Sequence, residues 1–278
     1  MSNGRVITSY FIYAILIALI PGLWTQHWLG FAIGAGIVII WWVIAAVMGD
    51  RILLKSMRAE PLNVVIYSEI GKIVTAKRLG HKFGIPSLWV ISDVAPMIMS
   101  VGLSPRASHL VFSKGFLDRL DDKAQLSMVV RELESIRAGR TSANTAASTL
   151  LWFIMLPGRL VNMITGRPPG EPNTLSTVVN LIPAFVAGLF VLLTADRPAM
   201  YAVDRAAQKQ LDNPDYVPYA LMKLQDAALG TPFNCELALT PCCVMNPNSR
   251  DPYAALFKPH PTTPKRIERL RPRTGKRR

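Results

Sequence analysis

The chain has 278 residues, half of which are hydrophobic and only 18% charged, and its mean hydropathy is +0.27. Soluble domains carry about 25% charged residues and disordered chains are poor in apolar ones, so the composition excludes a disordered chain and argues against an ordinary soluble globule. The 31 Lys and Arg exceed the 18 Asp and Glu, leaving a net charge of +13. We therefore expect a membrane protein with a basic water-facing part.

The N-terminal region is free of charged side chains. No Asp, Glu, Lys or Arg occurs between Val6 and Gly49, and an uncharged apolar run of this length predicts transmembrane helices. The run is long enough for two, over residues 6–24 and 28–48. A cleaved signal peptide is the alternative interpretation, which the absence of a cleavage-type site and the immediate second span disfavour.

Residues 50–145 are expected to form a small α+β unit in water. Short β-type runs alternate with turn residues, and helical spacing follows them. The second of the two helices after the strands has Asp121 and Asp122 as candidate N-cap residues. The predicted strands are residues 87–92, 96–101 and 109–113, and the predicted helices are residues 116–120 and 123–138.

Two further hydrophobic segments follow, at 146–165 and 174–195. The first is interrupted by Pro157, Gly158 and Arg159, and a charge in mid-span costs about 2.5–3.5 kcal/mol. This segment is therefore either a full span with its arginine facing protein or a re-entrant hairpin. The second segment is uncharged, with a possible kink at Pro183.

The C-terminal part, 196–278, is predicted to contain helices at 199–211 and 216–229, an irregular loop at 230–263 and a last short helix. From Lys265 onward the chain holds eight Lys or Arg and one Glu. A basic cluster beside a membrane favours anionic lipid. Nucleic acid is not expected, because no aromatic side chains interleave with this run.

The sequence thus predicts a mainly α, multi-pass membrane protein. Two N-terminal transmembrane helices (1–49) precede a cytoplasmic part (50–145), the second hydrophobic pair (146–195) and a cytoplasmic helical part with a basic tail (196–278). Lys and Arg follow the second span and precede the third, and by the positive-inside rule both termini face the cytoplasm. The oligomeric state is not predicted.

Three segments carry a resemblance to a known family. Residues 49–60 (GDRILLKSMRAE), residues 108–117 (SHLVFSKGFL) and His260-Pro261 with the following Arg266 and Leu270 occur in the order found in the HtpX-like membrane zinc metallopeptidases. The resemblance covers nearly the whole chain. It implies a peptidase-like cytoplasmic part split by a second hydrophobic pair, and location in the bacterial plasma membrane.

The resemblance also locates a degenerate catalytic helix. The family carries His-Glu-x-x-His, in which two histidines bind zinc and the glutamate activates water. Here Arg131 and Ser135 stand at the histidine positions, and Glu132 matches the general base. Met200 stands where the family supplies a glutamate ligand, and Asp204 keeps the second acid. The resemblance therefore implies a relic general base and no bound metal.

Other residues offer weaker alternatives for a rebuilt metal site. No two of the four histidines are spaced i, i+4, and His260 is the best cleft candidate because the family's matching histidine lies near its active site. Asp196 could share a helix face with Met200, and the three cysteines (Cys235, Cys242, Cys243) could bind a soft metal, although they lack Cys-x-x-Cys spacing.

Arg131 suggests a sharper hypothesis. Its guanidinium could fill the vacated place and pair with Glu132, Glu134 or Asp204, so that a fixed charge replaces the metal. The alternative is a solvated Arg–Glu pair on the helix surface.

Three functions remain open. The first is a non-catalytic HtpX-like protein of membrane protein quality control, which uses a retained cleft to bind, assemble or regulate membrane protein clients or a membrane complex. The second is an active zinc metalloendopeptidase with an unconventional metal site. The third is a structural subunit of a membrane complex, for which the cleft is irrelevant.

Overall fold

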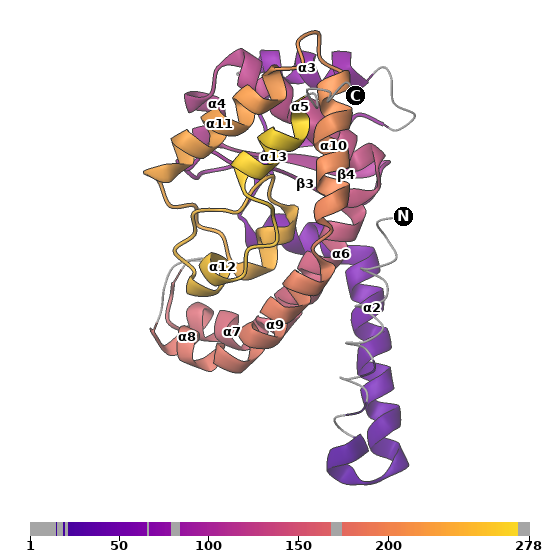
Figure 1. Ribbon diagram of the computed structural model, residues 1–278. Helices are drawn as coiled ribbons and strands as arrows, with labels where there is room; N and C mark the ends of the chain where they lie inside the picture. Colours follow the sequence, from indigo (N-terminus) through magenta and orange to yellow (C-terminus); the bar gives the residue numbers. More distant parts are fainter. Residues whose placement is uncertain are drawn as a thin grey trace, which may run out of the picture.

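The computed structural model describes residues 22–65, 67–78, 84–167 and 174–271, together with Ile15 and Leu19. The first predicted span, residues 6–24, lies almost wholly outside these residues, and so do residues 272–278 of the basic tail. The described part is mainly helical with one small mixed sheet (Figure 1).

Helix α2, Trp28–Ser56, confirms that the second predicted span is a helix. It is the one unbroken helix among the described residues that is long and apolar enough to cross a membrane. It runs on past the charge-free stretch to Ser56 because Leu53 and Leu54 are buried in the core of the water-facing part. The apolar half, in contrast, is mostly exposed and extends away from the rest of the molecule (Figure 1).

The sheet has four strands in the order β1-β2-β4-β3. The pair β2–β4 is parallel and the other two pairs are antiparallel. The three predicted strands are confirmed, although β3 begins two residues later than expected and continues to Ser104, where it turns directly into β4. The strands are β1 Glu60–Pro61, β2 Ser87–Ile91, β3 Ile98–Ser104 and β4 Ala107–Ser113.

Three helices complete this region: α3 Ser68–Arg78, α4 Lys114–Arg119 and α5 Asp122–Arg137. Asp121 is the N-cap of α5, because its carboxylate accepts a hydrogen bond from the backbone N–H of Ala124 at 2.8 Å. Helix α5 is buried at almost every position from Ala124 to Ile136. It is therefore the central helix, and its polar residues lie inside the protein.

Both later hydrophobic segments are broken helices. The first consists of α6 Arg140–Ile154 and α7 Leu156–Ile164, bent by 62°. The predicted interruption at Pro157 is displaced: the break is at Met155, and the proline lies in the first turn of α7, where its missing N–H costs nothing.

The second segment consists of α8 Thr174–Val179 and α9 Leu181–Thr194. It breaks at Asn180 rather than at Pro183, because a proline ring clashes with the carbonyl four residues earlier, here that of Val179. Among the described residues one helix could cross a membrane by itself, or up to three spans are possible if two bent pairs each count as one. These pairs are α6 with α7, and α9 with the following helix Arg197–Lys209, which is bent from α9 by 55°.

The C-terminal part begins with α10 Arg197–Lys209 and α11 Tyr216–Leu229, close to the predicted helices. The predicted irregular loop is only partly irregular. It contains the 3-10 helix η1 Leu237–Cys242 and the short helix α12 Pro252–Leu256, before α13 Thr263–Leu270.

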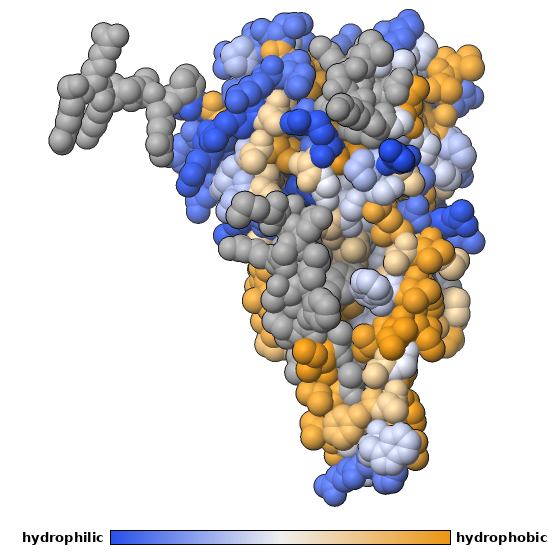
Figure 2. Space-filling model, turned by 90° about the vertical axis from the view of Figure 1, so that its right-hand side faces the viewer, coloured by the Kyte–Doolittle hydropathy of each residue, from blue (hydrophilic) through white to orange (hydrophobic). Residues whose placement is uncertain are grey.

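Polar and apolar elements are segregated along the molecule. Helices α5, α10, α11 and α13 gather around the sheet, whereas α7, α8, α9 and α12 lie toward the end from which α2 projects (Figure 1). Figure 2 shows a mostly hydrophilic upper part and a narrow, mostly hydrophobic lower part. Helices α7, α8 and α9 also expose large apolar side chains, among them Ile164, Val178 and Ile182. A second core, formed by α6, α9 and η1, joins the two regions.

Gly115 lies in the first turn of α4, at a point where the backbone of Val94 leaves no room for a side chain. A Cβ atom there would lie 2.1 Å from the Val94 carbonyl oxygen. We predict that Gly115→Ala lowers the free energy of unfolding by about 1–3 kcal/mol, measured by thermal unfolding in detergent. Gly230→Ala is the control, because no atom lies within 4 Å of its Cβ position; equal losses in both variants would contradict the prediction.

Candidate functional site

The five residues that the resemblance places at the family's catalytic and ligand positions lie where α5 meets α10. Arg131, Glu132 and Ser135 are on α5, and Met200 and Asp204 are on α10. Each of these five side chains is at most 2% exposed. Charged groups are almost never buried to this extent unless they are paired, so their partners decide what the site can do.

Arg131 joins the two helices through its guanidinium. Its Nε donates to Asp204 Oδ1 at 3.2 Å, and its Nη1 donates to Glu132 Oε1 in a short contact. The predicted pairing with Glu132 and Asp204 is confirmed, whereas Glu134 accepts instead from Arg137 Nε at 2.8 Å. The alternative of a solvated surface pair is wrong, because Arg131 is buried.

A second arginine reaches the same carboxylate. Arg266 of α13 donates from Nε to Asp204 Oδ2 and from Nη2 to Asp204 Oδ1, both at 2.7 Å. Its Nη1 donates to the Val244 carbonyl at 2.8 Å, and the side chain is fully buried. Sequence reasoning missed this role because Arg266 lies in the basic C-terminal run, although it also lies in the segment that resembles the family's C-terminal signature.

The ion cluster of Arg131, Arg266, Glu132 and Asp204 carries two positive and two negative charges. Burial alone would raise the pKa of Asp204, but the guanidiniums of Arg266 and Arg131 more than offset this, and the pKa is lowered. Burial alone would lower the pKa of Arg131, but the carboxylates of Glu132 and Asp204 raise it. The two arginines and two carboxylates thus compensate one another, and the formal charges of the four side chains sum to zero.

The remaining two ligand positions hold side chains without charge. Ser135 accepts a long hydrogen bond from Thr141 Oγ1, at 3.4 Å. Met200 is buried one turn before Asp204 on α10. Asp196, the other acid considered on this helix, is its N-cap and accepts from the Ala199 N–H at 3.0 Å. Its carboxylate is thus engaged at the start of the helix.

His260 is buried near the ion cluster. Its Nε2 donates to the Thr240 carbonyl at 2.7 Å, which assigns the proton to that nitrogen, and among the described residues Nδ1 has no hydrogen-bond partner. Burial and the nearby Arg140, Arg266 and Arg131 hold the pKa of His260 well below its usual value. The imidazole is therefore neutral at physiological pH.

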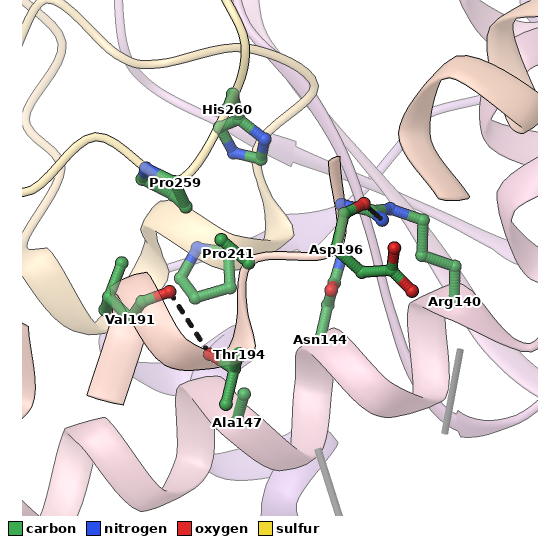
Figure 3. A pocket seen from close by; sticks show the side chains of 10 residues that line it. Arg140, Asn144, Ala147, Val191, Thr194, Asp196, Pro241, Pro259 and His260 are labelled. Atoms are coloured by element: carbon green, nitrogen blue, oxygen red, sulfur yellow. Dashed lines mark hydrogen bonds between the residues drawn. The ribbon is translucent and has the colours of Figure 1, made fainter. Parts of the chain in front are cut away.

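His260 lines a recess of about 310 Å³, including its open part, which we call the His260 recess. Figure 3 shows the imidazole and two prolines on one side, Val191 and Thr194 of α9 below, and Arg140 with Asn144 of α6 opposite. Arg140 donates to the Asp196 carbonyl at 2.9 Å. The recess is lined by Arg140, Asn144, Ala147, Val191, Thr194, Ala195, Asp196, Pro241, Pro259 and His260.

The cysteines do not form a metal-ligand set. Cys235 and Cys243 have their sulfur atoms 3.9 Å apart, and Cys242 lies 3.3 Å from Ser148 Oγ. Burial raises the pKa of Cys242 to about 12 and that of Cys235 well above its usual value. These thiols stay protonated at neutral pH, whereas metal binding requires the thiolate.

Comparison with known proteins identifies relatives across most of the chain. The profile of peptidase family M48 matches residues 100–274. A protein named protease HtpX homolog from Acidiphilium cryptum (strain JF-5) is 26% identical over 258 residues, covering 88% of this chain and 89% of that protein. Protease HtpX of Legionella pneumophila (strain Corby) is 25% identical over 234 residues, covering 80% and 81%. No solved structure matches the chain.

The residues present do not fit the zinc ion that this family implies. A guanidinium stays protonated and would repel a cation, and it is fixed here by two carboxylates. A serine hydroxyl and a thioether are poor ligands for zinc. Among the described residues no group of three or more His, Cys, Asp or Glu could hold a metal ion.

We predict that Arg131→Met destabilises the protein by about 3–5 kcal/mol, because it leaves buried carboxylates without their counter-charge. The double variant Arg131→Met/Glu132→Gln should recover part of this loss, since one of these carboxylates is neutralised. Denaturant unfolding in detergent measures both. Arg137→Met is the control, because that side chain is 54% exposed and should lose less than about 1 kcal/mol; an equally large loss there would refute the argument.

We predict that His260 makes stability fall on acidification. Its pKa is lowered in the folded state, so below the unfolded value of about 6.5 the unfolded chain binds a proton that the folded chain does not. The expected loss is about 1.4 kcal/mol per pH unit below that value. Unfolding at pH 7 and pH 5 should show a smaller difference for His260→Gln than for the unmodified protein. Parallel pH dependence in both would mean that His260 is not neutral and buried.

Proposed function

The chain belongs to peptidase family M48, and we propose that it is a non-catalytic, HtpX-like member of that family. In this proposal the protein keeps the peptidase-like cleft and uses it to bind membrane protein clients, or to help assemble or regulate a membrane complex. Its role would lie in membrane protein quality control, without peptide hydrolysis.

One observation supports the proposal: Arg131, which the resemblance places at a zinc-ligand position, belongs to a buried ion cluster whose formal charges sum to zero. Arg131 donates to Glu132 and Asp204, and Arg266 holds Asp204 with two further hydrogen bonds. A general base must be free to take a proton from water, whereas Glu132 is buried and its Oε1 accepts from a fixed cation. The cluster stabilises the contact of α5, α10 and α13 and offers no electrophile.

The His260 recess supports the choice of client. It lies between α6 and α9, and α9 exposes large apolar side chains such as Ile182, Phe185 and Leu193. Its lining combines apolar side chains of the helices, such as Ala147 and Val191, with polar groups of Arg140 and Asn144. A polypeptide segment emerging from the membrane would meet both an apolar wall and hydrogen-bonding groups there.

We further propose a multi-pass arrangement in the bacterial plasma membrane with both termini in the cytoplasm. The distribution of Lys and Arg supports it, since Arg51, Lys55 and Arg58 directly follow the apolar part of α2. The basic C-terminal residues beyond α13 would then face anionic headgroups.

We predict that the purified protein holds less than about 0.1 zinc per chain, before and after incubation with zinc, by elemental analysis. The triple variant Arg131→His/Ser135→His/Met200→Glu restores the ligand types of the family and should bind about one zinc per chain. A stoichiometric metal in the unmodified protein would favour the active peptidase with an unconventional site. Failure of the triple variant would show that the site geometry differs from the one described.

Client binding is tested by site-specific photo-crosslinking in membranes. A photoreactive residue at Asn144, in the His260 recess, should capture polypeptide partners, whereas the same residue at the exposed Met222 of α11 should not. Glu132→Gln should leave the captured set unchanged, since no hydrolysis is involved. Capture at neither position, with disruption of a stable complex by substitutions in α2 or α9, would favour the structural subunit.

A further inference from the structure

A second recess lies between the two broken helices and the C-terminal part, away from the ion cluster. It measures about 420 Å³, including its open part. Arg159 and Asn162 of α7, Asn180, and Tyr253 of α12 line it together with the carboxylates of Glu236 and Asp251. We call it the Arg159 recess.

Two buried polar atoms of this recess lack a partner. Arg159 Nε, a donor, and Asn162 Oδ1, an acceptor, are shielded from solvent and make no hydrogen bond with any described residue. The two residues are spaced i, i+3 on α7 and so lie on one helix face. Buried polar groups in proteins are nearly always satisfied, so an occupant should accept a hydrogen bond at Arg159 and donate one at Asn162.

The rest of the Arg159 side chain is firmly held. Its Nη2 donates to Glu236 Oε2, and its guanidinium stacks 4.7 Å from the ring centre of Trp152. Asp251 adds a second carboxylate, whose oxygens accept from the N–H groups of Leu237 and Tyr253, both at 2.9 Å. With one arginine and two carboxylates, the charged side chains of the recess sum to −1, which favours a cationic group beside Arg159.

The Arg159 recess is surrounded by aromatic and exposed apolar side chains, which are typical of the region where a protein meets lipid headgroups. Trp152 contacts Phe153, and Phe153 contacts Trp41 of α2 with ring centres 5.6 Å apart. Tryptophans are enriched where headgroups meet acyl chains. On α7 and α8, next to the recess, the apolar side chains of Met163, Ile164 and Val178 are 66–80% exposed.

We propose that the Arg159 recess binds the phosphoethanolamine headgroup of a bilayer phospholipid. The phosphate accepts from Arg159, and the ammonium donates to Asn162 Oδ1 and faces the two carboxylates. The acyl chains then follow the exposed apolar surface of α7 and α8. Phosphocholine has no N–H to donate, and a phosphoglycerol headgroup brings a negative charge to a recess that is already negative.

The site is independent of the proposed client binding, and its test uses the full chain purified in mild detergent. The protein is incubated with equal amounts of phosphatidylethanolamine, phosphatidylcholine and phosphatidylglycerol with identical acyl chains, and the retained lipid is counted by mass spectrometry. We expect about tenfold more phosphatidylethanolamine than phosphatidylcholine, the factor for one charge-assisted hydrogen bond. Equal retention, or a preference for phosphatidylglycerol, overturns the proposal.

Three variants assign the effect to the recess. Asn162→Leu removes the acceptor and should abolish the preference, whereas Asn162→Asp keeps an acceptor oxygen and should retain it. Asn144→Leu makes the same substitution in the His260 recess and should also retain it. Thermal unfolding checks that each variant is folded. If Asn162→Leu folds and still prefers phosphatidylethanolamine, the proposal is wrong. If Asn162→Leu does not fold, Asn162→Asp decides: loss of the preference for phosphatidylethanolamine in that variant also overturns the proposal.

Two further arms identify the source of the headgroup. Soluble phosphoethanolamine should raise the melting temperature less than the lipid does at equal concentration. If soluble phosphoethanolamine raises the melting temperature as much as the lipid does, and this increase is lost in Asn162→Leu, the ligand is a free headgroup and the assignment to the bilayer is wrong. If a lysine-containing peptide binds while phosphatidylethanolamine does not, the occupant is a client side chain and the lipid proposal is wrong.

Discussion

A carboxylate with no access to water must have its charge compensated inside the protein, and Asp204 is the residue on which the water-facing half depends for this reason. Both of its oxygens are held by arginines, one from α5 and one from α13. The same Arg266 reaches the backbone at Val244. One buried charge thereby joins the central helix, α10, the last helix and the loop that follows η1. Removing either arginine leaves the cluster with two buried carboxylates and one counter-charge, whereas replacing the whole set by apolar side chains would mainly change packing.

Local signals in the sequence predicted much of this architecture. The short strands at 87–91 and 107–113 follow from β-branched and aromatic residues between turns, and α5 follows from its Asp121 cap and continuous apolar spacing. The breaks at Met155 and Asn180 were displaced from the predicted prolines. A proline blocks the helical hydrogen bond to the carbonyl four residues earlier, so the helix breaks before the proline and not at it.

The site was predicted unevenly. The resemblance located Arg131, Glu132 and Asp204, and the requirement for a counter-charge predicted their pairing. Arg266 was not recognised, since a guanidinium in a run of basic residues looks the same in sequence whether it is solvated or fully buried. The Arg159 recess was invisible for a similar reason: Glu236 and Asp251 lie 77 and 92 positions further along the chain, and only the fold brings them to α7.

The two recesses lie toward opposite ends of the broken helices. The His260 recess adjoins the start of α6 and the end of α9, and the Arg159 recess adjoins α7 and α8. The second core connects them through α6, α9 and η1.

A bound metal ion is in equilibrium with free ion. The stability that it adds to a protein therefore depends on the concentration of free ion, and a chelator removes both the ion and this added stability. The guanidinium of Arg131 is covalently part of α5, so it cannot dissociate and its presence does not depend on the concentration of any ion. In the proposed non-catalytic protein the fold would therefore be independent of the cellular supply of zinc, and it would persist under metal starvation, when a metal-dependent protein loses its stabilising ion.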